Sequence, residues 1–306
     1  MSIVIPVAER GNDLLNRVKD YYATMAELGI KFEFIVILTP EFEFLHEELK
    51  NKYPGDSNLK IILLNRNYGE AGLLKIGVEH AAYDYILTLP PYEQIASSDI
   101  PTVIDSLQEN DAIAVNRYPR IDSVINRIQS SVFRGVLKLL SYNAPKDAGC
   151  GVRIVRKEVF DDLKLYGDLH RFFLILVEQA GFRTSELDIA QSKPDAHRRI
   201  YSFRTYLSRF LDIFTVVFLT RFNKKPLRFF GTAGALSAMV GAIGLGYLGV
   251  ERLFYNVAVA DRPLLVLFSL FLMLGAQLIA IGLVGEIIVF TSSKNNKEYR
   301  IRKIIN

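Results

Sequence analysis

Polar side chains that could do chemistry gather in short segments, each of which directly follows an apolar run of β type. The segments are 6–10, 38–41, 65–70, 90–94 and 116–120. Ligands of doubly wound α/β sheets bind at the carboxyl ends of strands, so a reaction site is expected in these turns. Glu93 and Gln94 offer the oxygen atoms that a hard cation prefers, but Pro90 and Pro91 beside them offer none. Arg117 follows the fifth run directly, where its side chain can point into the cleft.

The elements that would position these turns are read from the spacing of apolar residues. Five runs rich in Val, Ile and Leu are predicted as strands covered on both faces: 2–7, 32–38, 59–64, 85–89 and 111–115. Apolar residues from Leu14 to Leu28 recur with the period of an amphipathic helix, and Gly29 stands where a left-handed residue ends helices. Segments 72–82 and 101–108 predict further helices. This alternation predicts an α/β fold with a doubly wound, mainly parallel sheet.

Two segments near the C-terminus, 229–250 and 263–285, contain no Asp, Glu, Lys or Arg. At 1.5 Å per residue, each reaches roughly 33 Å, enough to cross a hydrocarbon core of about 30 Å. We predict a two-helix transmembrane hairpin. The alternative is a pair of core helices in a large soluble domain, which two such lengths joined by a short loop disfavour.

Basic residues flank this hairpin unevenly. Four precede the first span, two lie in the loop and five follow the second span: Arg221, Lys224, Lys225 and Arg228, then Arg252 and Arg262, then Lys294, Lys297, Arg300, Arg302 and Lys303. By the positive-inside rule, both termini face the cytoplasm. Aromatic, aliphatic and arginine residues mix in segment 201–227, which predicts a helix lying in the membrane interface. The alternative is that its apolar face docks on the soluble domain.

These patterns divide the chain into four parts. They are a cytosolic domain (1–200), an interfacial amphipathic helix (201–227), two transmembrane helices (228–293) and a basic cytosolic tail (294–306). Small residues recur along the first span at spacings that let helices approach closely in lipid: Gly231, Gly234, Ala238, Ala242 and Gly246. We expect this stripe to form a homo-oligomer, with packing between the two spans of one copy as the alternative.

Composition excludes several classes of protein. The chain has 306 residues, 50% of them hydrophobic, and a mean hydropathy of +0.18, which is too apolar for an ordinary soluble protein of this size. A net charge of +4 without a dense basic tract excludes nucleic acid as a partner. Cys150 is the single cysteine and is expected to be a packing residue, so neither disulfides nor a Cys/His zinc site is predicted. The apolar start at 3–7 is too short for a signal peptide.

Several motifs resemble those of family 2 glycosyltransferases. They are Ser-Ile-Val-Ile-Pro-Val at 2–7, Asn-Arg-Asn-Tyr-Gly at 65–69, Tyr-Ile-Leu-Thr-Leu at 85–89 and Asp-Ala-Gly-Cys-Gly-Val-Arg at 147–153. His-Arg-Phe at 170–172, Lys-Pro-Leu-Arg-Phe-Phe-Gly at 225–231 and the hairpin are similar to the polyprenyl-phosphate branch. The resemblance implies a GT-A-like fold that transfers a sugar from a nucleotide-sugar donor to a polyprenyl phosphate on the cytosolic face of a membrane. A bacterial inner membrane is the expected location.

The resemblance also implies roles for individual residues. Catalytic positions match Asp147, Arg117 and Arg127, and donor-binding positions match Pro6, Glu9, Asn67, Gly69 and Gln94. Positions for the acceptor phosphate match Arg120, Ser130, Arg134, His170 and Arg171. Plainer alternatives are solvated surface positions for the arginines, a turn cap for Asp147 and the start of a helix for His170.

The chain departs from this family on the donor side. The family holds Mg²⁺ or Mn²⁺ with an Asp-x-Asp motif after the fourth strand, where this sequence has Pro-Pro-Tyr-Glu-Gln at 90–94. Glu93 and Gln94 are therefore weak ligand candidates, and no certain metal site is predicted. Ala8-Glu9-Arg10 and the turn at 38–41 also depart from the family pattern. Two hypotheses follow: a glycosyltransferase with altered donor chemistry, or a catalytically inactive relative that binds or regulates another protein.

Overall fold

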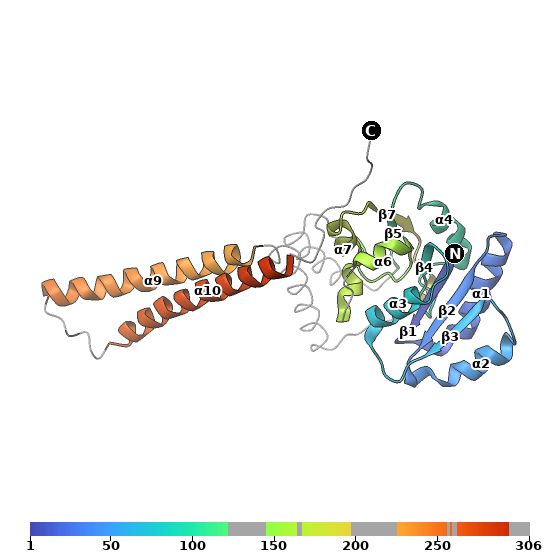
Figure 1. Cartoon of the computed structure of the whole chain (residues 1–306), viewed down its shortest axis with the longest axis horizontal. Coiled ribbons are helices and arrows are strands. Elements are labelled where there is room, and N and C mark those ends of the chain that lie inside the picture. Colours follow the sequence, from blue (N-terminus) through green and yellow to red (C-terminus); the bar gives the residue numbers. More distant parts are fainter. Residues whose placement is uncertain (122–144, 164–166, 197–224, 256–257, 259–261, 294–306) are drawn as a thin grey trace. The chain divides into compact units, whose positions relative to one another are not determined.

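The computed structural model of this chain describes residues 1–121, 145–163, 167–196, 225–255, 258 and 262–293 (Figure 1). The chain divides into two compact units, Met1–Val216 and Val217–Asn306. Of the predicted interfacial helix, only 225–227 lies among the described residues, and the predicted tail 294–306 lies outside them.

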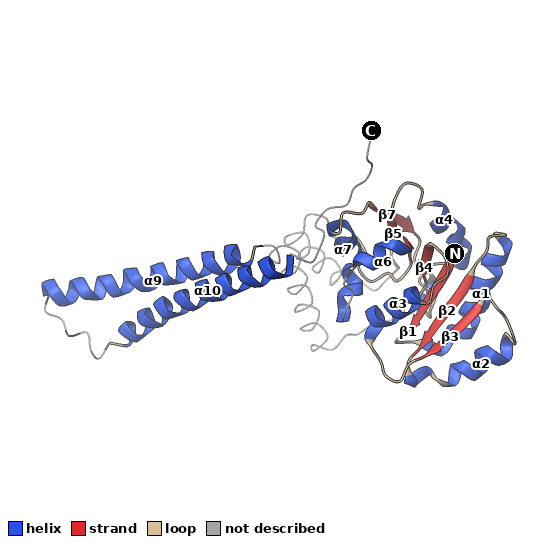
Figure 2. Cartoon of the chain, in the orientation of Figure 1, coloured by secondary structure: helices blue, strands red, loops and turns tan. Residues whose placement is uncertain are grey.

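The described part of the first unit is built on a seven-stranded sheet (Figure 2). The strands follow the order β3 (Leu59–Leu63), β2 (Glu33–Leu38), β1 (Ser2–Val7), β4 (Tyr85–Thr88), β6 (Arg153–Arg156), β5 (Ala112–Arg117) and β7 (Thr184–Ile189). Neighbours are parallel except that β6 runs antiparallel to both β4 and β5. The predicted mainly parallel sheet is confirmed.

Two of these strands were not predicted from the sequence. β6 is only 4 residues long and has arginine at both ends, so it lacks the apolar run by which a buried strand is predicted. β7 reads Thr-Ser-Glu-Leu-Asp-Ile and is largely half-buried, so it lacks the apolar run of a strand that is covered on both faces.

Helices cover both faces of the sheet because successive side chains of each strand point to opposite sides. Ile3, Ile5 and Val7 share one apolar core with α1 (Leu14–Glu27), α2 (Phe44–Lys52) and α4 (Ile100–Asp105). Val4 packs on the other face with α3 (Gly69–Glu79). Gly29 follows α1 with φ +63°, the left-handed conformation expected at the end of this helix.

The remaining short elements lie after β5 and in the connecting turns. α6 (Lys157–Asp162) and α7 (Phe173–Gln179) share a third apolar cluster with Val155. Short 3₁₀ helices are η1 (Gly11–Asp13), η2 (Pro40–Phe42), η3 (Ser97–Asp99), η4 (Gly167–Phe172) and η5 (Lys193–Ala196). His170 and Arg171 lie in η4, so His170 does not begin an α-helix, and α7 starts at Phe173.

The described part of the second unit is an antiparallel pair of long helices, α9 (Pro226–Tyr255) and α10 (Pro263–Ser293) (Figure 1). Both are long and apolar enough to cross a membrane. They approach closely at glycines: a Cβ atom at Gly234 would lie 2.7 Å from the carbonyl oxygen of Gly275, and one at Gly241 would lie 2.5 Å from the nitrogen of Leu272. Part of the small-residue stripe therefore packs within one copy, while a Cβ at Gly246 would meet open space.

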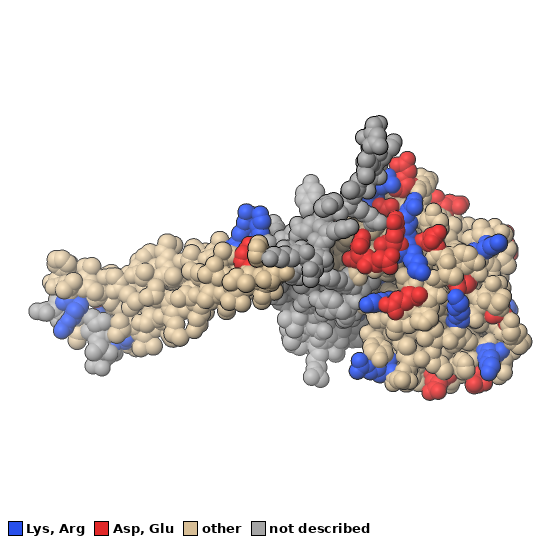
Figure 3. All heavy atoms as spheres, viewed as in Figure 1, with Lys and Arg blue, Asp and Glu red and all other residues tan. Residues whose placement is uncertain are grey.

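The surface of this hairpin is suited to lipid. In Figure 3 its middle is free of charged atoms, which lie towards its two ends. Large apolar side chains such as Leu253, Phe254 and Phe290 are exposed on it. An exposed apolar surface of this extent marks contact with a membrane or a partner.

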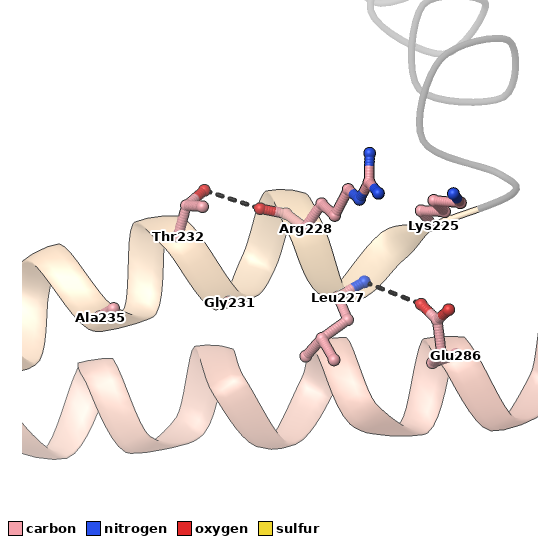
Figure 4. A pocket seen from close by; sticks show the side chains of 7 residues that line it. All are labelled: Lys225, Leu227, Arg228, Gly231, Thr232, Ala235 and Glu286. Atoms are coloured by element: carbon pink, nitrogen blue, oxygen red, sulfur yellow. Dashed lines mark hydrogen bonds between the residues drawn. The ribbon is translucent and has the colours of Figure 1, made fainter.

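A carboxylate of α10 caps the start of α9. Glu286 accepts a hydrogen bond of 3.3 Å from the backbone N–H of Leu227, which has no partner within its own helix turn (Figure 4). An open hollow of about 540 Å³ lies here, lined by Lys225, Leu227, Arg228, Gly231, Thr232, Ala235 and Glu286. The hydrogen bond gives a partner to an acidic side chain that would be costly to leave unpaired beside lipid.

Candidate active site at the carboxyl edge of the sheet

The switch point of the sheet lies between β1 and β4. β2 and β3 continue the sheet on one side of β1, and β4 pairs in parallel with its other side, with Val4 opposite Thr88. Ligands of such sheets bind where the strand order reverses, outside the carboxyl ends of the strands. The turns at 8–10 and 89–94 leave the sheet at this point.

The turn after β4 is bound into the fold by Gln94, which is 1% exposed. Its side-chain nitrogen donates to the hydroxyl of Tyr92 at 3.0 Å and to the carbonyl of Gly149 at 3.3 Å. Its side-chain oxygen accepts from the N–H of Gly151 at 2.7 Å. The amide therefore joins this turn to the loop that begins at Asp147.

Glu93 is held from two sides. Its carboxylate accepts hydrogen bonds from the guanidinium of Arg17 and from the hydroxyl of Ser192. Arg17 also pairs with Asp13 at 2.8 Å and with Asp20 at 3.1 Å. The carboxylate that the sequence offers in this turn is thus engaged in a structural network.

A buried ion cluster lies at the end of β5. The Nε and Nη2 atoms of Arg117 donate to both oxygens of Asp147 at 2.6 and 2.9 Å, and Nη1 donates to Asp195 at 2.5 Å. All three residues are buried. The bidentate pairing is the strong form of an arginine–carboxylate contact. Arg120, at 3.8 Å from Asp147, is more exposed.

This pairing controls the charges of the cluster. Burial acts to raise the pKa of Asp147, but the hydrogen bonds and charge of Arg117, aided by Arg120, lower the pKa below its ordinary value. Burial acts to lower the pKa of Arg117, and Asp147 outweighs it so that this pKa rises well above the ordinary value. Asp147 is therefore a fixed carboxylate beside a fixed cation. It also accepts the N–H of Gly149 at 3.1 Å, as a turn cap would.

A second charged cluster joins the start of α3 to η4. His170 lies 3.2 Å from Glu70, and Arg153 is buried beside them with its guanidinium 5.3 Å from the ring centre of Phe173. Burial acts to raise the pKa of Glu70, but the bond to His170 and the charges of Arg153 and Arg171 lower it to about 2. The structure thus brings the predicted acceptor residue His170 close to Gly69 on the predicted donor side.

Comparison with known proteins identifies the family. The family model described as glycosyl transferase family 2 matches residues 2–164, more than half of the chain. The chain belongs to this family.

Relatives extend the similarity over the whole chain. Undecaprenyl-phosphate 4-deoxy-4-formamido-L-arabinose transferases of Proteus mirabilis and Klebsiella pneumoniae are 26% and 27% identical to this glycosyltransferase, covering 100% of the chain and 94% and 93% of the relatives. The structure of glucosyl-3-phosphoglycerate synthase from Mycobacterium tuberculosis with Mn²⁺ and UDP-glucose aligns with a TM-score of 0.50 at 9% identity, over 71% of this chain and 77% of that one. The latter likeness supports the fold alone.

The residues of this glycosyltransferase do not fit the divalent cation that its family implies. At the position of the family's Asp-x-Asp motif, Pro90 and Pro91 have no side-chain oxygen. The side chains of Gln94 and Glu93 are hydrogen-bonded to Gly151 and Arg17. Throughout the part of the chain that the structure describes, no cluster of three His, Cys, Asp or Glu side chains could hold a metal ion. The donor set is therefore unsuited to a hard cation.

The other predicted donor-side residues lie in β1 and in the turns after β1 and β3. Pro6 is buried within β1, and Glu9 is exposed in the turn after it. Asn67 accepts the N–H of Gly69 at 2.8 Å, and Gly69 adopts φ +73° where α3 begins. The predicted residues Arg127, Ser130 and Arg134 lie outside the described part of the chain.

Three residues of these clusters had no predicted role in the site. Asp195 completes the coordination of Arg117, and Glu70 and Arg153 surround His170. Arg153 ends the Asp-Ala-Gly-Cys-Gly-Val-Arg motif, which was its only signal. Glu70 and Asp195 carry no local signal, because each is an ordinary carboxylate until the fold pairs it.

Proposed function

We propose that this glycosyltransferase is anchored in a membrane by α9 and α10 and transfers a sugar from a nucleotide-sugar donor to a polyprenyl phosphate on the cytosolic face. One observation carries the proposal. The named undecaprenyl-phosphate transferases match the entire chain, including the hairpin as well as the sheet domain. A hairpin suited to lipid would hold the site near a lipid-borne acceptor.

The transfer needs little proton chemistry from the protein. An oxygen of the acceptor phosphate, which carries about −1.5 to −2 charges near pH 7, attacks the anomeric carbon of the donor sugar. The bond from that carbon to the diphosphate oxygen breaks, and its electron pair leaves with the nucleoside diphosphate. The protein must therefore position two anions and stabilise the departing one.

We assign Asp147 and Arg117 to the positioning of the reacting groups, together with Arg127. Arg120, Ser130, Arg134, His170 and Arg171 are assigned to the acceptor phosphate. Arg120 supports this assignment because it is partly exposed beside Asp147, whereas Arg117 is fully engaged.

The test is transfer by the purified full-length protein in detergent. It is incubated with undecaprenyl phosphate and separate nucleotide sugars, and lipid-linked sugar is measured by mass spectrometry. Misplaced catalytic groups commonly cost about 10²-fold in rate, so Asp147→Asn should lower turnover by at least about this factor. Asp188→Asn is the control, since Asp188 lies at the end of β7 and pairs with Asn116 at 2.7 Å.

A catalytically inactive, binding or regulatory role is the second candidate. The engagement of Glu93 and Gln94 within the fold favours it, because the turn after β4 offers no free carboxylate. Undecaprenyl phosphate bound without turnover of any donor would support this role and overturn the first proposal.

We further propose that both termini face the cytoplasm of a bacterial inner membrane and that copies associate through the open end of the glycine stripe. In a Cys150→Ser background, Asn256→Cys should react with an impermeant thiol reagent outside intact cells, and Asn296→Cys should not. Gly246→Cys should cross-link between copies, because a Cβ there meets open space within one copy. Reversed labelling would overturn the orientation, and monomer alone would overturn the association.

A further inference from the structure

The turns after β1 and β4 meet through Arg10 and Tyr92. The guanidinium carbon of Arg10 lies 5.1 Å from the ring centre of Tyr92. A guanidinium within about 6 Å of an aromatic ring is held there by cation–π attraction. This contact therefore spans the two turns that border the switch point of the sheet, where a ligand is expected.

The hydrogen-bond donors of Arg10 remain available in this position. Arg10 is exposed, and none of the five N–H donors of its guanidinium forms a hydrogen bond with another residue of the described part of the chain. Among the described residues, no carboxylate forms an ion pair with Arg10. Arg17 differs from Arg10 in this respect. Its guanidinium forms ion pairs with three carboxylates, those of Asp13, Asp20 and Glu93.

The backbone of Arg10 is also unusual. It adopts φ 57° and ψ 40°, the left-handed conformation that residues other than glycine rarely take. Such outliers cluster at functional sites. A glycine at this position would keep the turn without strain and would remove only the side chain.

We infer that Arg10, seated on Tyr92, binds the diphosphate of the nucleotide-sugar donor and supplies the positive charge for which this turn has no fitting metal ligands. The inference rests on the proposed function. When the bond from the anomeric carbon to the diphosphate breaks, the electron pair stays on the diphosphate oxygen. The N–H edge of Arg10 donates hydrogen bonds to that anion, and no proton needs to be transferred.

The test is binding by the purified full-length protein, measured by calorimetry with UDP, GDP, CDP, ADP and inorganic pyrophosphate as probes. Each probe is titrated in EDTA and again in Mn²⁺. We expect at least one nucleoside diphosphate to bind equally in both solutions. Arg10→Gly should weaken that binding about 10- to 100-fold, the range for loss of a hydrogen bond between charged groups. Arg10→Lys should retain part of the affinity.

Arg156→Ala is the matched control. The guanidinium carbon of Arg156 lies 5.7 Å from the ring centre of Tyr85, the same kind of cation–π contact at the opposite end of β4. Its loss should leave binding unchanged. Binding that requires Mn²⁺, or that Arg10→Gly does not weaken, would overturn the inference and leave the proposed transfer standing. If no probe binds in either solution, the donor half of the proposed function fails as well.

Discussion

The turn after β4 and the end of β5 lie at the same edge of one sheet, yet they hold charge in opposite ways. At β5, Arg117 is buried between two carboxylates in a bidentate pairing. After β4, Pro90 and Tyr92 occupy the positions from which carboxylates would reach a cation, and Glu93 and Gln94 are engaged with other elements.

The difference teaches that one edge of a sheet can keep a closed ion cluster at one strand while the turn after another strand departs from its family's pattern. Arg117 and Asp147 form a closed cluster in which removal of either partner leaves an uncompensated buried charge. The turn after β4 stays folded through amide and salt-bridge contacts that need no ligand. A turn without the family's metal ligands is therefore compatible with an intact sheet and an intact Arg117–Asp147 pair.

The largest expected effect is at the buried cluster. Arg117→Met should lower the free energy of unfolding by about 3–5 kcal/mol, because Asp147 and Asp195 lose their buried partner. Urea denaturation followed by circular dichroism measures this loss. Arg120→Met is the control and should cost less than about 1 kcal/mol, since its contact with Asp147 is 3.8 Å and partly exposed. Equal losses for the two variants would show that Arg117 is not the buried partner on which the two carboxylates depend.

A gain of metal binding would sharpen the comparison on the donor side. Replacing Pro90 and Tyr92 together by Asp should create Mn²⁺ binding, because carboxylate oxygens would then stand beside Glu93. Electron paramagnetic resonance detects the bound ion. The same positions changed to Asn serve as the control. An Asp variant without bound Mn²⁺ would show that the turn itself, and not only its side chains, differs from a metal site.

A smaller effect is expected where Glu93 holds the turn. Glu93→Gln should lower the free energy of unfolding by about 1.5 kcal/mol, because charge-assisted hydrogen bonds from Arg17 and Ser192 are weakened. Asp20→Asn should cost at most about 0.5 kcal/mol, as a helix-surface pair does. A Glu93→Gln protein as stable as the Asp20→Asn protein would mean that this network does not hold the turn.

The smallest expected effect is a pH dependence at Glu70, because its side chain is 35% exposed and water screens much of its interaction with His170. Its pKa of about 2 lies below the ordinary value of 4.5, so its stabilising contribution is present above pH 4.5 and is lost as the pH falls toward 2. The melting temperature of Glu70→Gln should therefore lie below that of the unchanged protein near pH 7, and the gap should close in acid. A difference in melting temperature that widens in acid would show that the charged form of Glu70 does not stabilise the fold. Glu79→Gln, on the exposed face of α3, should give a smaller gap at every pH.

Local patterns predicted much of the fold. The five apolar runs became β1 to β5, the periodic segment from Leu14 became α1, and the two uncharged segments lie within α9 and α10. Such features arise from neighbouring residues, since strand alternation, helix period and helix length are properties of consecutive positions. The departure from the family's Asp-x-Asp motif could be read from the sequence for the same reason, because Pro90–Gln94 is one continuous stretch.

Pairings between distant residues were decided only by the tertiary structure. Arg117 meets Asp195 across 78 positions, and Arg17 meets Glu93 across 76. β6 and β7 are short or polar and become strands through their neighbours in the sheet, a context on which strand formation depends strongly. The identity of a charged residue in the sequence does not show whether its side chain is solvated or buried. Its partner, and with it its pKa and its role, is set by which segments the sheet brings to one edge.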